Sequence, residues 1–308
     1  MTETCRRILE EYQVRKSTKQ KLRFIEFLQS RYPELRVEEG GWPRCRNLIL
    51  GDPDSAQVIL TAHYDTCARL PFPNFITPKN LLITLAYSLV ITLPFFVIPF
   101  FLEFLAVRYL PGDLWWSPLV ALALGLFLVY YVFIGGPANP HTVNDNTSGV
   151  LTLCLLLDTL SPEQRAKAAF VFFDHEESGL FGSSRFARLH AKGLKNKLIV
   201  NFDCVSDGDH LFLVQSRRAR KHWGERLAAA YQPREGKEIR LERSAFCFYP
   251  SDQMNFPCAV GVAALRKAPV IGYYMGRIHT ARDTVMDERN LEILAEGTAR
   301  LLETVQAK

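Results

Sequence analysis

Two long apolar segments interrupt an otherwise mixed pattern of hydrophobic and polar positions in this chain of 308 residues. Residues 81–102 form 22 consecutive uncharged and mostly apolar positions, and residues 114–134 form 21. At about 1.5 Å rise per residue, a helix of either length crosses a hydrocarbon layer of about 30 Å. Tryptophans and tyrosines lie near the two ends of the second segment, where a membrane interface favours them. The pattern predicts a two-helix transmembrane hairpin, and two buried core helices of a soluble protein are the alternative.

Outside these segments, short apolar runs alternate with amphipathic stretches. Strands are expected near residues 48–50, 58–62, 168–173, 198–202, 210–214 and 259–264, and helices over 5–31, 149–160, 180–192 and 287–307. This alternation favours the α/β class, as a three-layer sandwich with a mixed, largely parallel sheet. We expect a discontinuous catalytic domain of residues 1–69 and 137–308, interrupted by the hairpin at 70–136 with its helices at about 81–102 and 114–134.

The charge distribution suits a protein at a membrane surface. The formal net charge is +5, and because the three charges between residues 80 and 136 sum to −1, the remainder carries +6. The basic residues are scattered, which argues against nucleic acid as a partner and favours a mild attraction to anionic lipid headgroups. The turn between the apolar segments is net negative, whereas Arg69 and Lys79 precede the first segment. We therefore expect a multi-pass membrane protein whose catalytic domain is cytoplasmic.

Seven cysteines show no spacing typical of a disulfide framework and include no CxxC motif. The first 30 residues read as a charged amphipathic helix and not as a signal peptide. Both observations favour a reducing, cytosolic environment. Cys154 and Cys204 fall in apolar stretches and are expected to be small buried hydrophobic residues.

Several residues that can bind metal lie where predicted strands end. His63, Glu176, Glu177 and Asp203 follow apolar runs, and Asp145 precedes a predicted helix. Open α/β sheets place their sites in the crevice beyond the carboxyl ends of their strands. A set of imidazoles and carboxylates without cysteine suits a catalytic site for zinc or a similar divalent ion. In a pair of adjacent glutamates, one can bind metal while the other acts as a general base.

The order of motifs HxD, DNxSG, EE, NxD and HTxxDT resembles the co-catalytic zinc aminopeptidases of the aminopeptidase Y and bacterial leucyl aminopeptidase type. Their wider family includes glutaminyl cyclases and glutamate carboxypeptidases, and the resemblance covers nearly the whole chain apart from the hairpin. It implies two divalent ions, with zinc expected, and the bridging ligand would be Asp145. His63 and Asp203 would bind one ion, and Glu177 and His279 would bind the other.

The same resemblance implies roles for three further residues. Asp65 would orient His63, Glu176 would be the general base, and Tyr249 of the FYPSDQ segment would stabilise the oxyanion, with Ser251 and Asp252 as supports. A packed loop tyrosine is the alternative for Tyr249. The chain departs from the family pattern at Gln253, where histidine is common, and at Asn144, where aspartate is usual. Neither is an expected ligand, so substrate preference and not metal binding is put in doubt.

These observations predict a membrane-anchored, zinc-dependent exopeptidase that hydrolyses peptide or aminoacyl substrates like an aminopeptidase. A metal-bridged hydroxide would attack the scissile carbonyl, with glutamate as the general base. The alternatives are a glutaminyl-cyclase-like aminoacyl cyclotransferase, which uses one metal, and a catalytically silent membrane receptor or scaffold. A dipeptidase, a carboxypeptidase and an N-acyl amino-acid hydrolase also stay open.

Three arginines and one histidine could lie near the site without binding metal. Arg69, Arg243 and Arg277 either line a pocket for a substrate carboxylate or are ordinary surface arginines. His141 is expected at the rim of the site and not among the ligands. The two apolar segments can pair with each other or with those of a second copy, so a homo-oligomer through the hairpin is also open.

Overall fold

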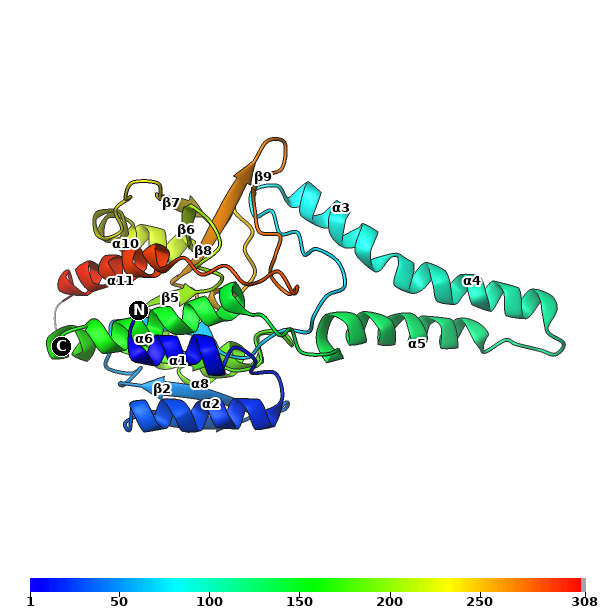
Figure 1. The fold of residues 1–308 in the computed structure, drawn as a ribbon, viewed down its shortest axis with the longest axis horizontal. Coiled ribbons are helices and arrows are strands. Elements are labelled where there is room, and N and C mark those ends of the chain that lie inside the picture. The colour runs from blue at the N-terminus through cyan, green and yellow to red at the C-terminus, as the bar shows by residue number, and fades with distance from the viewer. Residues whose placement is uncertain (306–308) are drawn as a thin grey trace.

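A nine-stranded mixed sheet forms the centre of the protein, whose computed structural model describes residues 1–305 (Figure 1). Along the sheet the strand order is β1-β2-β4-β3-β5-β8-β6-β7, and β9 pairs with β8. The strands are β1 (Arg36–Gly40), β2 (Cys45–Leu50), β3 (Val58–His63), β4 (Ala168–Phe173), β5 (Leu198–Phe202), β6 (His210–Gln215), β7 (Glu238–Arg243), β8 (Ala259–Ala268) and β9 (Gly272–Tyr274).

The middle of the sheet is parallel and has an antiparallel pair on each side; beyond these, β1 pairs antiparallel with β2 and β7 pairs parallel with β6. Strands β4, β3, β5 and β8 run parallel to one another, so that their carboxyl ends lie along one edge. Strands β2 and β6 pair antiparallel with β4 and β8 at the two margins. The central strands are buried on both faces and therefore carry almost continuous apolar sequences.

Helices cover both faces of this sheet and complete three layers. Alternate residues of β3 point to different sides: Leu60 joins the larger core cluster, whereas Ile59 joins the smaller one. The larger cluster is covered by α1 (Glu3–Glu11), α2 (Thr18–Arg31), α6 (Gly149–Thr159), α10 (Arg217–Ala230) and α11 (Glu288–Glu303). The smaller one is covered by α8 (Phe181–Leu189) and α9 (Ala191–Leu194), and α7 (Pro162–Ala166) packs beside β4 and α11.

The expected α/β class with a mixed sheet between helical layers is confirmed, and every predicted strand is present. The helix predicted over residues 5–31 is wrong as a single element, because α1 and α2 are separate. Ser17 caps α2: its side chain accepts from the Gln20 N–H, and the Gln20 side chain accepts from the Ser17 N–H. This capping box starts a new helix after the turn that contains Arg15. The last two residues of the helix predicted over 287–307 lie outside the described residues.

The hairpin projects away from the domain as an extended pair of helical arms (Figure 1). One arm comprises α3 (Leu81–Thr92) and α4 (Pro94–Tyr109), and the other comprises α5 (Ser117–Tyr130) with its continuation η1 (Tyr131–Gly135). Both arms, Leu81–Tyr109 and Ser117–Gly135, are long and apolar enough to cross a membrane. The first arm extends beyond the predicted residue 102 to Tyr109, and the Glu103 carboxylate within it accepts a hydrogen bond from Ser117 Oγ of the second arm at 2.7 Å. Helices α4 and α5 pack against each other within this one chain.

The base of the hairpin is joined to the domain by backbone contacts. Ala68 and Ala138 form an antiparallel bridge, so the two ends of the insertion leave the domain side by side. Ile76 and Met275 form a second bridge, with N–H···O distances of 3.1 and 2.9 Å. The Leu70 N–H also donates to the His279 carbonyl at 2.8 Å. The hairpin is therefore attached to the loop that carries one of the predicted metal ligands.

Candidate metal centre

The predicted ligands converge at the edge where the parallel strands end. His63 is the last residue of β3, the two glutamates follow β4, and Asp203 follows β5. Asp145 lies in the turn η2 (Val143–Ser148) that leads into α6, where it departs from helical geometry and is joined to Asn146 by a cis peptide bond. His279 lies in the loop after β9 with φ of +60°. Five segments therefore contribute one set of imidazoles and carboxylates.

The carboxylate of Asp145 lies between the two histidines. Its Oδ1 is 3.4 Å from His63 Nε2, and its Oδ2 is 2.9 Å from His279 Nε2. Asp203 Oδ1 is 3.5 Å from the same nitrogen of His63, and Glu177 Oε2 is 3.4 Å from that of His279. The ligand set thus divides into two groups that share one aspartate, as the resemblance implied.

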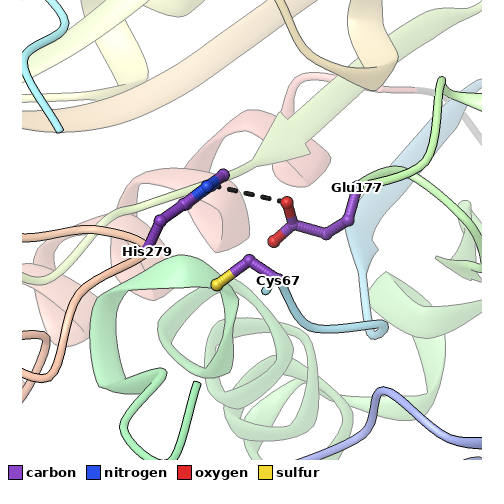
Figure 2. Close-up of side chains that lie close together, drawn as sticks. All are labelled: Cys67, Glu177 and His279. Carbon is purple, nitrogen blue, oxygen red and sulfur yellow. Dashed lines mark ion pairs between the residues drawn. The ribbon is translucent and has the colours of Figure 1, made fainter. Parts of the chain in front are cut away.

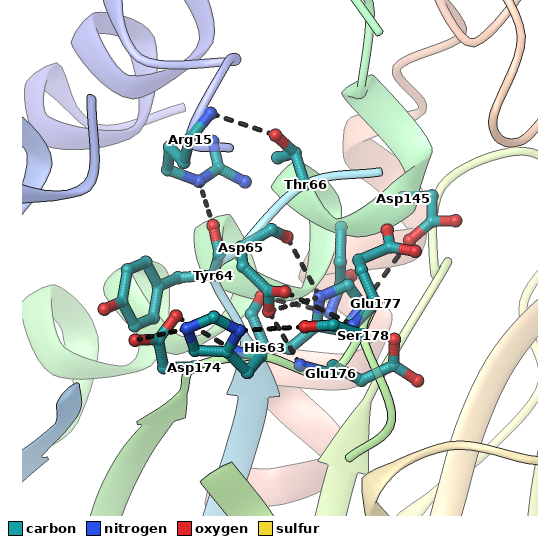
Figure 3. A network of polar contacts seen from close by, with 12 residues as sticks. Arg15, His63, Tyr64, Asp65, Thr66, Asp145, Asp174, Glu176, Glu177 and Ser178 are labelled. Atoms are coloured by element: carbon teal, nitrogen blue, oxygen red, sulfur yellow. Dashed lines mark hydrogen bonds and ion pairs between the residues drawn. The ribbon is translucent and has the colours of Figure 1, made fainter. Parts of the chain in front are cut away.

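Asp65 supports the glutamate pair more directly than it supports His63 (Figure 3). Its Oδ1 accepts from the Glu176 N–H at 3.0 Å, and its Oδ2 accepts from the Glu177 N–H at 3.3 Å. His63 Nδ1 lies 3.1 Å from the Asp65 carbonyl and 3.7 Å from its carboxylate. Asp65 therefore links the ends of β3 and β4 and orients the two glutamates.

The site has the properties of a cation site. Glu177 Oε1 and Asp203 Oδ1 are buried and accept no hydrogen bond from the described residues. Burial, and then the Asp145 carboxylate, raises the pKa of Glu177 to about 8. Burial and the neighbouring carboxylates also raise the pKa of Glu176 well above its ordinary value. Buried acids without a compensating charge are costly, so divalent cations fit this donor set.

A cavity of about 410 Å³ opens onto these side chains. Its polar wall includes Asp145, Glu176, Glu177, Asp203 and His279, and its apolar wall includes Ile76, Ile134 and Ile278. Two of these isoleucines come from the base of the hairpin. None of Arg69, Arg243 and Arg277 is among the lining residues, and Arg277 instead approaches Asp207 at 3.4 Å. His141 is exposed and makes no part of this wall.

The segment that contains Tyr249 closes one side of the cavity. The Tyr249 hydroxyl donates to the Asp203 carbonyl at 3.1 Å, and its ring is 6% exposed. Gln253, which replaces the usual histidine, accepts from Asn201 Nδ2 at 3.0 Å and donates to the Tyr249 carbonyl. Asn201 Nδ2 also donates to Ser251 Oγ at 3.0 Å. The glutamine therefore has a structural role, because it fixes the loop against β5.

Asn144 also has a structural role at its unusual position. Its Oδ1 accepts from the backbone N–H groups of Ser206 and Asp207, at 2.7 and 2.9 Å. An amide oxygen can accept both bonds as a carboxylate would. The departure from the family pattern therefore leaves the support of the adjacent Asp145 intact.

Two supporting residues were missed by the sequence analysis. Asp283 accepts from the backbone N–H groups of Asn144 and Asp145, at 2.7 and 3.0 Å. Arg15 is fully buried behind the ligand loops, where it donates to the Tyr64 carbonyl at 2.5 Å and to Thr147 Oγ1 at 3.2 Å (Figure 3). Asp283 belongs to the HTARDT motif that also contains His279, so the sequence could have marked it as a site residue. No local pattern distinguishes Arg15.

Solved structures resemble the whole chain in fold. LapA of Legionella pneumophila aligns with 99% of this chain and 72% of its own, at 12% identity and a TM-score of 0.56. A glutaminyl cyclase from an Acidobacteriales bacterium aligns with 97% of this chain and 91% of its own, at 15% identity and a TM-score of 0.58. The zinc aminopeptidase BSAP of Bacillus subtilis aligns with 86% of this chain, at 18% identity and a TM-score of 0.48, and this chain spans 51% of its length.

No curated protein sequence matches the chain. The family description "Peptidase family M28", however, matches residues 131–302, which is more than half of its 308 residues. The matched segment contains Asp145, both glutamates, Asp203 and His279, whereas His63 and Asp65 lie before it. Those two residues join the others in space at the ends of neighbouring strands. The fold, the site and the matched segment agree, and the chain belongs to peptidase family M28.

Proposed function

We propose that this protein is a membrane-anchored, zinc-dependent aminopeptidase with two metal ions. The observation that supports it most is the position of Asp145, whose two carboxylate oxygens face different histidines. Each histidine has its own further carboxylate, Asp203 or Glu177. A shared carboxylate between two complete ligand groups favours two ions, and therefore hydrolysis, over a single-metal cyclase.

The chain's own residues supply the remaining chemistry. Two zinc ions, when bound, would activate a water and polarise the scissile carbonyl. A carboxylate oxygen of Glu176 lies within 4.8 Å of a ring nitrogen of His63 and a carboxylate oxygen of Asp203, and Glu176 lines the cavity. Glu176 does not form an ion pair with either histidine, unlike the proposed ligands Asp145, Asp203 and Glu177. It can take a proton from the attacking water and give it to the departing amine. Tyr249 can serve as an oxyanion donor once its hydroxyl turns from the Asp203 carbonyl into the cavity.

The charge of the cavity favours substrates with a free amino terminus. Its wall combines four carboxylates with isoleucine side chains and contains no arginine or lysine among the described residues. Two bound zinc ions would offset most of this negative charge, but Glu176, which is not among the proposed ligands, can still accept from a substrate ammonium, and no cationic side chain in the wall can bind a substrate carboxylate. This favours an aminopeptidase over a carboxypeptidase, and it favours apolar side chains next to the scissile bond.

The exposed apolar surface of the hairpin supports membrane anchoring. Most of its large side chains are at least 39% exposed, including Leu82, Val90 and Phe104. A soluble monomer rarely leaves such a continuous apolar surface in water. The bilayer is the partner that covers two arms of this length, and the distribution of positive charge favours a cytoplasmic domain.

The first experiment replaces the proposed base. Glu176→Gln in the full-length, zinc-loaded protein should keep about two zinc equivalents and lose at least about 100-fold in kcat on a leucyl amide. Glu225→Gln on the exposed face of α10 is the matched control and should keep its activity. Near-normal turnover of Glu176→Gln would contradict the proposed role.

Metal content and products separate the two chemical alternatives. Two zinc equivalents with release of a free amino-terminal residue support the aminopeptidase. One equivalent with pyroglutamyl formation and ammonia release from a glutaminyl peptide supports the cyclase. A protein that binds no metal and cleaves none of a panel of aminoacyl amides, dipeptides and N-acyl amino acids would instead be the silent scaffold.

The hairpin is tested by replacing residues 81–130 with a flexible Gly/Ser linker. This deletion keeps Ile76 and Ile134, which line the cavity, so that it removes the arms and not the wall of the site. We expect loss of liposome binding, and a larger loss of kcat/KM on hydrophobic than on soluble peptides in the presence of liposomes. Equal changes on both substrates would reduce the hairpin to an anchor, and retained liposome binding would contradict anchoring itself.

A further inference from the structure

A cysteine lies against the second ligand group. Cys67 is two residues beyond Asp65 in the loop after β3, and it is fully buried. Its Sγ, a carboxylate oxygen of Glu177 and a ring nitrogen of His279 all lie within 4.8 Å of one another (Figure 2). The three side chains come from three separate segments and meet in one space. Sequence spacing alone gave no reason to include this thiol among the ligands.

The carboxylate that faces this thiol is incompletely satisfied. The Glu177 side chain is 9% exposed, and one of its oxygens lies 3.4 Å from His279 Nε2. The other, Oε1, is buried and accepts no hydrogen bond from any residue in the described part of the chain. A buried carboxylate oxygen without a donor fits a position that binds a cation.

We propose that Cys67 is a thiolate ligand of the metal ion that Glu177 and His279 hold. The inference rests on the proposed dinuclear function and changes its ligand set. One position would then be bound by His63 and Asp203, and the other by Cys67, Glu177 and His279, with Asp145 shared between them. The second ion would have four protein ligands, so the open position for water and substrate would lie on the first ion, which has three. Metal binding replaces the thiol proton, which passes to solvent.

A sulfur ligand makes the two metal positions chemically unequal. Thiolate favours zinc over harder ions such as Mg²⁺ and Mn²⁺, whereas a set of one imidazole and carboxylates discriminates less. The Cys67 position should therefore fill first when zinc is limiting and keep its ion longer against a chelator. Hard divalent ions should exchange mainly at the His63 position.

Cys204 provides the closest matched control. Its Sγ lies within 4.8 Å of carboxylate oxygens of Asp145 and Asp203, so it borders the first ligand group through Asp203 and approaches the second only through the shared Asp145. Cys154 provides a remote control, because it is equally buried but lies in α6 within the main core cluster. These three cysteines separate a ligand, a neighbour of the site and a core residue.

The decisive measurements use full-length protein in detergent. In the wild type, X-ray absorption at the zinc edge should contain one sulfur scatterer at about 2.3 Å, and cobalt loading should give a thiolate charge-transfer band. Cys67→Ser should lose both signals and, at limiting zinc, most of its metal, whereas Cys204→Ser and Cys154→Ser should keep them. Because the wild-type spectrum needs no variant, misfolding of Cys67→Ser would leave the test intact.

Each contrary outcome has a separate meaning. Bound zinc with only nitrogen and oxygen neighbours would overturn the thiolate while leaving the proposed function in place. A sulfur signal that survives Cys67→Ser and disappears in Cys204→Ser would also overturn it. Failure of the wild-type protein to bind any metal would overturn both this inference and the proposed function.

Discussion

The buried ion pair between Lys21 and Asp174 should be the most damaging single contact to break outside the metal site. Lys21 Nζ lies 2.5 Å from Asp174 Oδ1, and the two side chains are 6% and 0% exposed. Asp174 Oδ2 also accepts from the Arg46 N–H at 2.9 Å. The pair fixes α2 to the end of β4, directly before the glutamate pair.

Lys21→Met removes the ammonium and leaves the buried carboxylate with two backbone N–H donors, from Arg46 and His175, and with the His175 ring at 3.9 Å. Breaking a buried pair in this way costs about 3–5 kcal/mol, a large part of a total stability of about 5–15 kcal/mol. For a domain of this size the melting temperature should fall by roughly 6–20 °C. We expect the same Lys21→Met background to regain at least about 1 kcal/mol when Asp174→Asn is added, because the charge is then removed as well.

The assay is thermal unfolding of the full-length protein in detergent, with metal content held constant. Arg165→Met breaks an exposed pair with Glu34, whose side chains are 35% and 53% exposed, and should change stability by less than about 1 kcal/mol. A melting temperature of Lys21→Met within about 2 °C of the wild type would refute the reasoning. So would a double variant that is no more stable than Lys21→Met alone.

Three further predictions concern the site. Glu177 and Asp145 overcome the opposing effect of burial and raise the pKa of His279 to about 9, and the pKa of Glu177 is raised to about 8. Both groups therefore hold protons in the folded, metal-free protein that the unfolded chain releases. The melting temperature after chelation should fall as pH rises from about 5 to about 9. A melting temperature that rises over this range would contradict the prediction, and bound zinc should make the melting temperature less dependent on pH. Ile134→Ala should lower kcat/KM for leucyl relative to alanyl substrates by roughly tenfold, and an unchanged ratio would exclude this residue from the specificity wall. Asp283→Ala removes two hydrogen bonds, from the backbone N–H groups of Asn144 and of the proposed bridging residue Asp145, so zinc affinity should fall roughly 10–100-fold, as measured by competition with a chelator.

The parts of the fold that the sequence predicts are those that local patterns determine. The apolar run of β3 ends at His63, that of β5 is followed directly by Asp203, and the glutamate pair begins three residues after β4. The carboxyl ends of parallel strands are where open α/β sheets place their sites. The two helical arms of the hairpin could also be predicted, because each is a long stretch without charged residues. By contrast, β1 has the sequence RVEEG with three half-buried and two exposed residues, and β9 has only three residues, so neither carries a periodic signal.

The parts of the site that escaped prediction depend on contacts between distant segments. In the sequence, Cys67 looks like a small buried core residue. It lies near the proposed metal ligands Glu177 and His279 only because the loops after β3, β4 and β9 pack together. Arg15 was assigned to the middle of a helix, where its burial against Tyr64 has no local cause. Gln253 and Asn144 had the reverse problem: their departure from the family pattern was visible, but their hydrogen-bond partners were not.

The place of the hairpin in the chain has a consequence for the order in which the protein is made. Of the proposed ligands, only His63 and Cys67 precede the hairpin, while the shared aspartate and all the others follow it. During synthesis both apolar arms therefore leave the ribosome before any complete ligand group exists. In the proposed membrane-anchored enzyme, the arms would therefore reach the bilayer while the metal site is still incomplete. The site would be completed only afterwards, when the loop with His279 packs against the base of the hairpin, so delivery to the membrane would come before activation.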